Sequence, residues 1–229
     1  MAKIGIIFAM EEELVELKKY IKIYEEKKIY DLIFYCGTLG EHDVVLVESG
    51  IGKVHAARCT QVLIDQMNID YVFNIGVAGG VDPKVTIGDI VVGEKLVQHD
   101  YDLTAFGHDL GYVPKVGVYV ESDPYLLEVA ITLKKDGVYQ GVIASGDSFF
   151  TDISKTKELE SKFHALCVEM EGASIAQVCS LCNVPFLVIR SISDSPYQGD
   201  SFTSYEEFLE DSSKKVALFL KSIIEKLEK

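Results

Sequence analysis

The sequence predicts an α/β fold, a three-layer αβα sandwich around a mixed, mainly parallel twisted sheet. Two observations lead to this fold class. Short apolar runs typical of buried strands alternate with longer segments whose apolar residues recur at helical spacing, and this alternation is typical of a sheet covered by helices on both faces. The 229 residues are also 48% hydrophobic, and no linker-like stretch divides them. We therefore expect one domain with one large core over residues 1–229.

The N-terminal half begins with a strand expected over Ile4–Phe8, a short apolar run. The acidic segment after it opens a helix expected from about Glu11 to Tyr20. Two strands are expected to pair around a turn at Gly40–Asp43, and a helix and two buried strands follow them. These five elements are expected over Leu32–Tyr35, Val44–Glu48, Lys53–Met67, Tyr71–Ile75 and Ile90–Val97.

The C-terminal half begins with the stretch His99–Pro114, whose glycines, aspartates and aromatic residues predict a long functional loop. A long helix is expected to end the chain, from about Tyr205 to Leu227, because residues such as Phe219 and Ile223 recur at helical spacing. Helices and strands alternate between the loop and this helix. They are expected over Tyr125–Lys134, Val138–Ala144, Ser154–Phe163, Leu166–Val168, Glu171–Cys182 and Phe186–Ile192.

The charge balance of the chain is strongly acidic. It has 36 Asp and Glu against 22 Lys and Arg, a formal net charge of −14. A polyanion such as nucleic acid would be repelled by this charge, which favours a small uncharged or cationic substrate. No stretch reaches the roughly 18 uncharged residues that a membrane-spanning helix needs, and no signal-peptide pattern follows the apolar start. We expect neither a nucleic-acid nor a membrane partner.

The five cysteines are odd in number and lie in apolar surroundings, which favours reduced thiols in a cytoplasmic protein over a disulfide framework. The pair Cys179-x-x-Cys182 has a spacing found in metal and redox motifs, but no second pair accompanies it, so buried core thiols are the favoured interpretation. The segment His99–Asp102 is equally weak as a metal motif. No second histidine follows four residues later, which favours a loop hydrogen-bond network.

A glycine-rich turn, Gly50-Ile51-Gly52-Lys53, follows an expected strand. It fails as a phosphate-binding loop because valines occupy positions 47 and 54, where that motif needs glycine and a magnesium-binding hydroxyl. It fails as a dinucleotide fingerprint because His55 takes the place of the third glycine. A tight turn that brings backbone close to a ligand is the remaining interpretation.

In open α/β sheets the ligand lies beyond the carboxyl ends of the strands. The segments just after the expected strands are Met10–Glu13, Ser49–Lys53, Gly76–Gly80, Ser145–Phe150, Glu169–Glu171 and Ser191–Asp194. Carboxylates stand in four of these six segments, a composition unlike that of a phosphate cradle. Taken singly, each acidic group has a structural alternative, because carboxylates in a first helical turn complement the helix dipole and Asp194 would serve as a loop cap.

Together these segments resemble the bacterial methylthioadenosine/S-adenosylhomocysteine nucleosidases, in order and essentially from end to end. The segments that carry the resemblance are Ile4–Glu13, Ser49–Val54, Asn74–Gly80, Thr104–Gly107, Ser145–Phe149, Val168–Ala173 and Arg190–Asp194. The resemblance implies the nucleoside phosphorylase/hydrolase α/β sandwich and hydrolysis of the adenine–ribose bond in 5'-thio-substituted adenosines. It also implies a cytoplasmic enzyme of methionine salvage that needs no cofactor and no metal.

The catalytic roles that the resemblance implies fit the reaction. Cleavage of an N-glycosidic bond builds positive charge on the ribose and negative charge on the departing base. Asp194 would be the general acid near adenine N7, and Glu13 the general base that activates water, with Arg190 helping to hold that water. Glu171 would bind the ribose hydroxyls and stabilise the cationic sugar electrostatically.

The resemblance also implies the substrate contacts. Adenine would lie against Phe149, the backbone of Phe150 and Ser193, and the Met170 backbone would assist at the ribose. The 5'-thio substituent would occupy an apolar slot formed by Met10, Ile51, Leu103, Phe106 and Tyr205. His108 and Pro114 match positions that the family lends to the neighbouring subunit's slot, which implies a homodimer.

Two departures from the family pattern have expected consequences. Val77 stands where a serine is common near the water, so fewer partners would hold that water. The segment Ser195–Thr203 differs in composition from its counterparts and is expected to close over the site.

Two rival functions remain open at this point. A purine nucleoside phosphorylase has the same fold but needs cations around phosphate, whereas Glu13 would repel it. A non-catalytic nucleoside-binding protein would not need a base aimed at water. The sequence does not rank methylthioadenosine, S-adenosylhomocysteine, 5'-deoxyadenosine and futalosine-type compounds as substrates.

Overall fold

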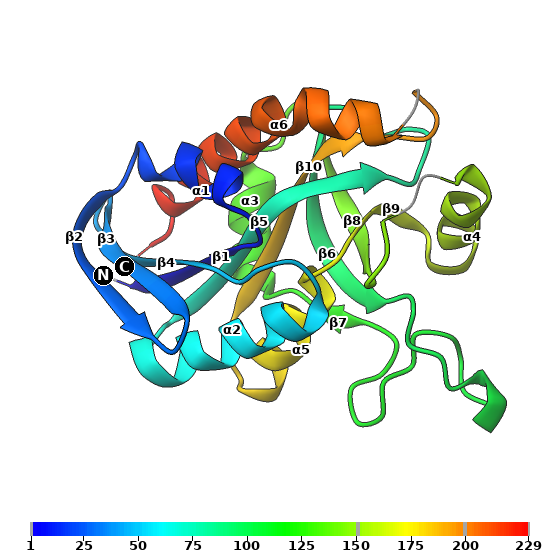
Figure 1. Cartoon of the computed structure of the whole chain (residues 1–229), viewed down its shortest axis with the longest axis horizontal. Coiled ribbons are helices and arrows are strands. Elements are labelled where there is room, and N and C mark those ends of the chain that lie inside the picture. Colours follow the sequence, from blue (N-terminus) through cyan, green and yellow to red (C-terminus); the bar gives the residue numbers. More distant parts are fainter. Residues whose placement is uncertain (1, 150–151, 199–200, 229) are drawn as a thin grey trace.

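A twisted mixed sheet runs through the molecule, and helices cover both of its faces (Figure 1). The computed structural model describes residues 2–149, 152–198 and 201–228, without the side chains of 201–204. The strands in this part of the chain are β1 (Lys3–Phe8), β2 (Lys22–Ile29), β3 (Leu32–Leu39), β4 (His42–Glu48), β5 (Tyr71–Gly80), β6 (Ile90–Gln98), β7 (Val120–Glu121), β8 (Val138–Ser145), β9 (Ala165–Glu169) and β10 (Phe186–Asp194). The helices are α1 (Glu11–Lys18), α2 (Lys53–Met67), the short 3-10 helix η1 (Thr104–Phe106), α3 (Pro124–Thr132), α4 (Ile153–Phe163), α5 (Gly172–Leu181) and α6 (Ser201–Ile224).

The sheet has a parallel centre and antiparallel additions. β1 pairs in parallel with β4 and β5, β5 with β10, and β8 with β6 and β9. Antiparallel pairings of β10 with β6 and of β9 with β5 complete a closed ring. The ring consists of β5, β10, β6, β8 and β9. The hairpin of β2 and β3 extends the sheet beyond β4. The predicted α/β class with a mixed sheet is therefore confirmed.

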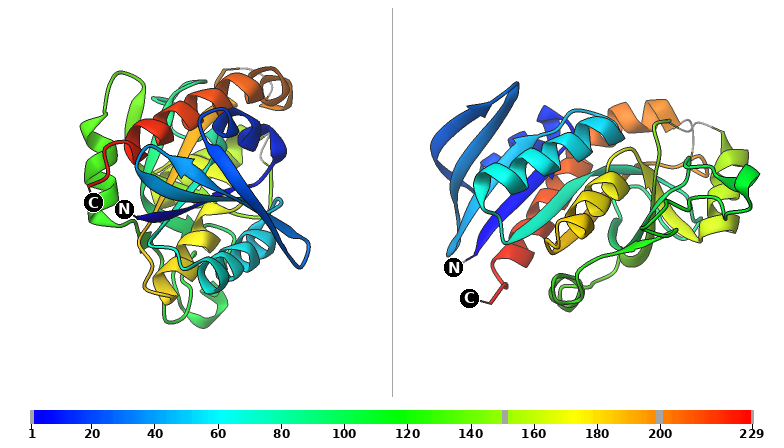
Figure 2. Two further views of the ribbon diagram at one scale, coloured as in Figure 1. Left: turned by 90° about the vertical axis from the view of Figure 1, so that its left-hand side faces the viewer. Right: turned by 90° about the horizontal axis from the view of Figure 1, so that it is seen from below.

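Helices form the two outer layers of the sandwich. α1, α3 and α6 cover one face, where Leu14, Leu126 and Leu220 are buried in one apolar cluster with strand residues. α2 and α5 lie side by side on the other face (Figure 2), where Leu63 and Ile175 belong to a second cluster. Removing these apolar side chains from water supplies most of the driving force for folding.

Helix boundaries follow local capping chemistry. α3 begins after Asp123, whose carboxylate accepts a 3.0 Å hydrogen bond from the backbone N–H of Leu126, and Pro124 occupies the first helical position. α4 begins after Asp152, whose carboxylate accepts from the N–H of Ser154 at 2.8 Å. α2 ends at Asn68 in the left-handed conformation.

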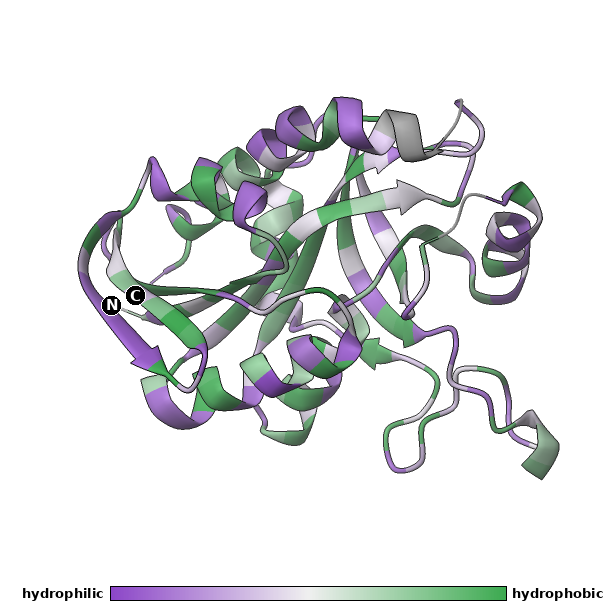
Figure 3. Cartoon of the chain, in the orientation of Figure 1, coloured by the Kyte–Doolittle hydropathy of each residue, from purple (hydrophilic) through white to green (hydrophobic). Residues whose placement is uncertain are grey.

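The strand β2 departs from the sequence-based expectation, which had no strand between the first helix and Leu32. Its sequence KIYEEKKI is largely exposed, and most of its length is coloured as hydrophilic (Figure 3). It is an edge strand that pairs only with β3 among the described residues. Charged side chains on an edge strand discourage pairing with other chains, and they also hide the strand from a search for apolar runs.

The expected long loop between β6 and β7 is present and projects from the body of the molecule (Figures 1 and 2). It contains η1, and Phe106 at the end of η1 is 80% exposed. Burying a side chain of this size is worth about 1.5–3 kcal/mol, and Phe106 does not gain this free energy within its own chain.

Candidate active site

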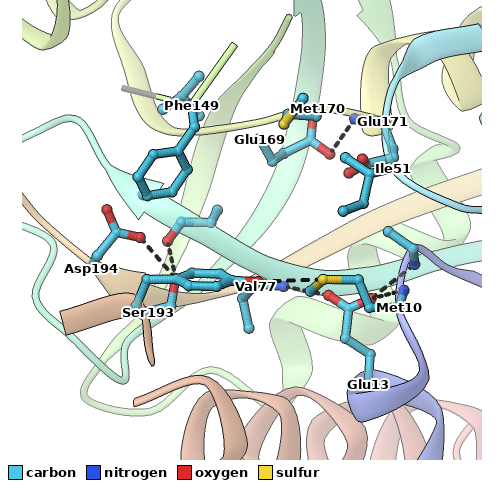
Figure 4. Close-up of a pocket in the computed structure, with 15 residues that line it drawn as sticks. Met10, Glu13, Ile51, Val77, Phe149, Glu169, Met170, Glu171, Ser193 and Asp194 are labelled. Carbon is cyan, nitrogen blue, oxygen red and sulfur yellow. Dashed lines mark hydrogen bonds between the residues drawn. The ribbon is translucent and has the colours of Figure 1, made fainter. Parts of the chain in front are cut away.

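A cavity of about 400 Å³ lies at the carboxyl ends of the strands, where the sequence analysis placed the ligand. Segments far apart in the chain contribute to it: the β1–α1 turn, the β4–α2 turn, β5, the β8–α4 loop, the end of β9 and the end of β10. Its lining consists of Ala9, Met10, Glu13, Ile51, Val77, Ala78, Gly79, Phe149, Val168, Glu169, Met170, Glu171, Ser193, Asp194 and Tyr205. Figure 4 shows Asp194 on one side of the cavity and Glu13 and Glu171 on the other.

Glu13 is anchored by three backbone donors. Its Oε2 accepts hydrogen bonds from the N–H groups of Ala9 (2.8 Å) and Met10 (3.2 Å), and its Oε1 accepts from the N–H of Val77 (3.1 Å). Burial raises the pKa of Glu13 above its ordinary value, and the positive charge of Arg190 and the three N–H donors oppose that rise. The carboxylate is therefore fixed in direction and more basic than an exposed glutamate.

The approach of Glu13 to β5 depends on a glycine. A Cβ atom at Gly76 would lie 2.5 Å from Oε1 of Glu13 and 3.1 Å from Nη1 of Arg190. Any side chain at this position would displace the carboxylate. Gly76 lies within β5, which runs to Gly80 and not to Ile75 as the sequence analysis expected.

Glu171 stands between α5 and the glycine-rich turn. It is the N-cap residue of α5 and 6% exposed, and its Oε1 accepts a 2.8 Å hydrogen bond from the N–H of Gly52. Burial, together with the negative charge of Glu169, raises the pKa of Glu171 to about 7, against the opposing effect of Arg190. The group therefore changes its charge near neutral pH.

Arg190 is buried and held by the chain's own acceptors. Its Nη2 contacts Oε2 of Glu169, donates to Oδ1 of Asn74 at 2.6 Å and lies 3.8 Å from Oε2 of Glu171. The sequence analysis expected this guanidinium to help hold the attacking water. Its Nε has no hydrogen-bond partner among the described residues, and its Nη1 would lie 3.1 Å from a Cβ at Gly76 and is 3.5 Å from the Ile189 carbonyl oxygen. Arg190 is not among the residues that line the cavity.

Sequence reasoning gave Glu169 no role, yet it organises the site. Its Oε1 accepts from the Ser145 hydroxyl, and its Oε2 accepts from the N–H groups of Glu171 (3.1 Å) and Gly172 (2.7 Å) as well as from Arg190. Both oxygens of Glu169 are therefore engaged by donors of the chain itself. A carboxylate directly before a helix, two residues from Glu171, was the available signal.

Asp194 ends β10 and is 2% exposed. The hydroxyl of Ser193, which also lines the cavity, donates to its Oδ1 at 2.9 Å. The other oxygen, Oδ2, would lie 3.2 Å from a Cβ at Gly79. Ser193 thus serves Asp194 directly, which places an acidic side chain with one oriented oxygen at the edge of the apolar cavity.

The rest of the cavity wall is apolar. Tyr205 meets the ring of Phe149 edge-on at 5.8 Å between centroids, and its hydroxyl donates to Sδ of Met10 at 3.3 Å. Burial raises the pKa of Tyr205 to about 12, so the hydroxyl stays protonated. Phe149 and Ile51 are about half exposed, and with Val77 and Met170 they complete the wall. Such a wall suits an aromatic base and an apolar substituent.

Leu103 and Phe106, which were expected in the apolar slot, do not lie beside the cavity of their own chain. Neither residue lines the cavity, because both lie on the projecting loop between β6 and β7. His108 and Pro114 are exposed on the same loop, and His108 stacks on Tyr112 at 4.4 Å. The Phe150 contact and the middle of the Ser195–Thr203 segment lie outside the described residues.

The glycine-rich turn is occupied by the chain's own carboxylates. Gly52 has a φ of +97°, which favours glycine, and its N–H points at Glu171. The next N–H, of Lys53, donates to Oδ1 of Asp147 at 2.9 Å. No lysine or arginine belongs to the described lining of the cavity. An external phosphate would find neither free donors nor a free cation here.

No cluster of three or more His, Cys, Asp or Glu side chains among the described residues has the arrangement of a metal site. No helix in the described ranges is long and apolar enough to cross a membrane.

Comparisons with known proteins agree with this geometry. The sequence model of the phosphorylase superfamily matches residues 3–225. A 5'-methylthioadenosine/S-adenosylhomocysteine nucleosidase of Geobacillus sp. (strain WCH70) is 42% identical over 99% of this chain and all of its own. A Helicobacter pylori nucleosidase mutant, solved with 5'-methylthioadenosine in the active site, is 37% identical with a TM-score of 0.94 over 99% of this chain and 100% of its own. A futalosine hydrolase of Helicobacter pylori is 37% identical with a TM-score of 0.93 over 99% and 98%.

Proposed function

The chain belongs to the phosphorylase superfamily, and we propose that it is a hydrolytic member, a 5'-methylthioadenosine/S-adenosylhomocysteine nucleosidase. It cleaves the N-glycosidic bond of 5'-thio-substituted adenosines, and of 5'-deoxyadenosine, to adenine and the free 5'-substituted ribose. The nucleosidases that resemble it over their full length support this activity. The cavity supports it too, because it pairs an apolar wall with buried carboxylates.

In the proposed reaction, Asp194 donates a proton to N7 of adenine as the bond to the ribose lengthens. Its burial and its place in the cavity lining support this role, and the hydrogen bond from Ser193 orients its Oδ1. Phe149 stacks on the departing base, and the neutral wall around it resists the entry of bulk water.

On the opposite side, Glu13 accepts a proton from the attacking water. The three backbone donors set its direction, and its raised pKa makes it a stronger base. Arg190 helps to hold the water, a role supported by Gly76, where a Cβ would lie close to both Nη1 of Arg190 and Oε1 of Glu13. Glu171 accepts hydrogen bonds from the ribose hydroxyls, and its negative charge stabilises the cationic sugar at the transition state. The Met170 backbone assists at the same place.

One observation carries the choice of hydrolase over phosphorylase. The described lining of the cavity contains three glutamates, Glu13, Glu169 and Glu171, and no lysine or arginine. At about 4 Å and an effective dielectric constant of 20, two like charges repel by roughly 4 kcal/mol, and a phosphate dianion would meet about twice that. Water meets no such penalty and finds a base.

A non-catalytic nucleoside-binding protein is the weaker candidate. Binding alone does not require a carboxylate fixed by three N–H donors, nor a buried acid across the cavity from it. Both features cost folding free energy, because they bury ionisable groups.

A homodimer follows from the projecting loop. Because Leu103 and Phe106 lie outside their own chain's cavity, we place both in the slot of a neighbouring subunit, together with His108 and Pro114. The 80% exposure of Phe106 supports this arrangement. The five unpaired cysteines support a cytoplasmic location, where thiols stay reduced. One domain over residues 1–229 is supported by α1 and α6, from opposite ends of the chain, packing in one cluster.

The test is incubation with 5'-methylthioadenosine in buffer with and without phosphate. We expect adenine release at the same rate in both, with free 5'-methylthioribose as the sugar product. A sugar 1-phosphate product, or a rate that rises with phosphate concentration, would overturn the hydrolase assignment. Parallel incubations with S-adenosylhomocysteine and with a futalosine-type nucleoside would rank the 5' substituents.

A further inference from the structure

Two segments that flank the cavity are tied together by charged residues that do not line it. The backbone N–H of Lys53, at the start of α2, donates to Oδ1 of Asp147 in the β8–α4 loop at 2.9 Å. The N–H of Asp147 donates in turn to Oδ2 of Asp100, just beyond β6, at 3.0 Å. The ammonium group of Lys53 closes the circle with a 2.5 Å contact to Oδ1 of Asp100.

Both segments carry residues that face the ligand. The turn before Lys53 contains Ile51, which lines the cavity, and Gly52, whose N–H holds Glu171 at 2.8 Å. The loop that contains Asp147 continues to Phe149, the proposed adenine-stacking residue. Since the N–H groups of Gly52 and Lys53 are consecutive, one bound to Glu171 and the other to Asp147, a movement of Asp147 would turn both.

The same lysine also reaches the helix that Glu171 caps. Its ammonium donates to Oε1 of Gln98 at 3.2 Å, and the amide of Gln98 donates to Oε1 of Gln177 in α5 at 2.6 Å. Lys53 therefore links three elements around the cavity: its own turn, the end of β6 and helix α5. Its side chain is only 17% exposed, and that of Asp100 29% exposed, so solvent screens their ion pair less than that of a surface pair.

We propose that Lys53, Asp100 and Asp147 form a brace of positioning residues, which holds the Gly52 N–H on Glu171 and fixes the separation of Ile51 and Phe149 across the cavity. This inference rests on the proposed function, because it assigns the brace a part in hydrolysis. None of the three residues lines the cavity, so the brace acts through Glu171 and the two walls.

The brace influences the charge of Glu171. The charged groups that face Glu171 are Glu169 from β9, Arg190 from β10 and Glu13 from α1, and the Gly52 N–H is the hydrogen-bond donor that favours its ionised form. A Gly52 N–H that turns away removes that donor. The pKa of Glu171 would then rise. Since hydrolysis needs the ionised carboxylate at the ribose, the pH below which activity is lost would rise with it.

The test compares Asp147→Ala with Asp147→Asn. Asp147 is exposed and its described side-chain bond is the one from Lys53, so neither variant threatens the fold. Alanine removes the acceptor, whereas asparagine keeps an oxygen in its place. For Asp147→Ala we expect kcat/KM toward 5'-methylthioadenosine to fall about 3- to 10-fold at pH 7, the size of one net hydrogen bond. We also expect the acid limb of its pH profile to move to higher pH, and asparagine to restore both values.

Asp70→Ala is the matched control. Asp70 is exposed and also accepts one backbone N–H, from Lys3 at 2.7 Å, but lies at the other end of the sheet. We expect wild-type kcat/KM and an unmoved acid limb for it. An Asp147→Ala enzyme with wild-type kcat/KM, a uniform fall at every pH, or a failure of asparagine to restore the limb would each overturn the brace.

A second measurement isolates the ion pair. Lys53→Met and Asp100→Asn should each lower kcat/KM, and the loss in the double variant should be smaller than the product of the two single losses, because both changes break the contact between Lys53 and Asp100. Fully additive losses would contradict the brace. Failure of the wild-type protein to release adenine would instead refute the proposed function, so the two ideas fail separately.

Discussion

The backbone N–H of Val77 donates a 3.1 Å hydrogen bond to Oε1 of Glu13, which lies 64 residues earlier in the chain. This bond joins the middle of β5 to the first turn of α1. It directs the proposed base from outside its own helix, while Ala9 and Met10 hold its second oxygen. The base is therefore preorganised, and its function should be sensitive to the loss of one oxygen.

Replacing Glu13 by Gln should abolish hydrolysis. An amide cannot accept the proton from water, and its NH₂ group would face an N–H donor where an oxygen now accepts. Loss of a general base lowers turnover by about 10²–10⁴-fold. Adenine release, measured with and without phosphate, should be negligible in both buffers. Phosphate-dependent cleavage by this variant would show that the site can use phosphate as the nucleophile, and would contradict the hydrolase assignment.

Replacing Asp194 by Asn should also lower turnover by about 10²–10⁴-fold, because an amide cannot protonate the departing adenine. Ser193 can still donate to the remaining oxygen, so the fold should survive, as circular dichroism and thermal unfolding would show. Substrate binding, followed by isothermal calorimetry, should persist. Near wild-type turnover in this variant would remove Asp194 from the mechanism.

The apolar wall should select for a 5' thioether. Adenosine would bury its 5'-hydroxyl against Met10 and Ile51 without a hydrogen-bond partner, which costs roughly 1–3 kcal/mol. Competition assays should therefore give 5'-methylthioadenosine a kcat/KM about 5- to 150-fold above that of adenosine. Equal values for the two nucleosides would mean that the 5' position lies elsewhere.

Subunit mixing should reveal whether Phe106 acts in a partner's slot. Phe106→Ala should raise KM for 5'-methylthioadenosine about tenfold or more, because a large buried surface is lost. Mixing it with the inactive Asp194→Asn variant should restore activity, since a mixed dimer has one cavity with Asp194 and an intact Phe106 from the neighbour. No gain on mixing, or a fully active monomer by light scattering, would contradict the dimer.

The raised pKa of Glu171 predicts a specific pH dependence of stability. Its value of about 7 exceeds the ordinary 4.5, so between these pH values the folded protein binds a proton that the unfolded chain has released. This contribution favours folding at low pH and is lost as the pH rises through about 7. Since each tenfold change in proton affinity corresponds to about 1.4 kcal/mol, the loss is on the order of 3 kcal/mol.

Replacing Glu171 by Gln should remove that loss. The inactive variant should exceed the wild type in free energy of unfolding at pH 8, and the gap should narrow toward pH 5. Urea unfolding at both pH values measures it. A gap of equal size at both would indicate a packing effect and not the titration of Glu171.

Much of the fold was predictable because buried strands have recognisable apolar runs in the sequence. The runs at Ile4–Phe8 and Phe186–Ile189 are continuous and contain no polar side chain, and both belong to central strands of the sheet. β2 was missed for the opposite reason, since five of its eight residues are charged, which its exposed edge position permits. The ends of β5 and β10 were placed too early, because glycines and polar residues that serve the cavity interrupt the apolar pattern.

The site was predictable where one chain suffices. Glu13, Glu171 and Asp194 all line the cavity, as their positions after strands implied. Glu169 was missed because the sequence does not distinguish it from the neighbouring Glu171. Only the fold shows that Glu169 is bound by hydrogen-bond donors of the chain itself. Leu103 and Phe106 do not line the cavity of their own chain, because their loop projects from the body of the molecule. The sequence does not indicate whether such a loop folds back over the site or extends away from it.

The occupied turn at Gly52 and Lys53 limits how this enzyme can change during evolution. Its two N–H groups are bound by Glu171 and Asp147, and the nearby guanidinium of Arg190 is bound by Glu169. A lineage that exchanged water for phosphate would have to free the turn, remove the base and supply a cation. Removal of the base alone forfeits hydrolysis before phosphorolysis becomes possible, so an inactive intermediate separates the two reactions, and selection for activity at each single substitution preserves the hydrolase.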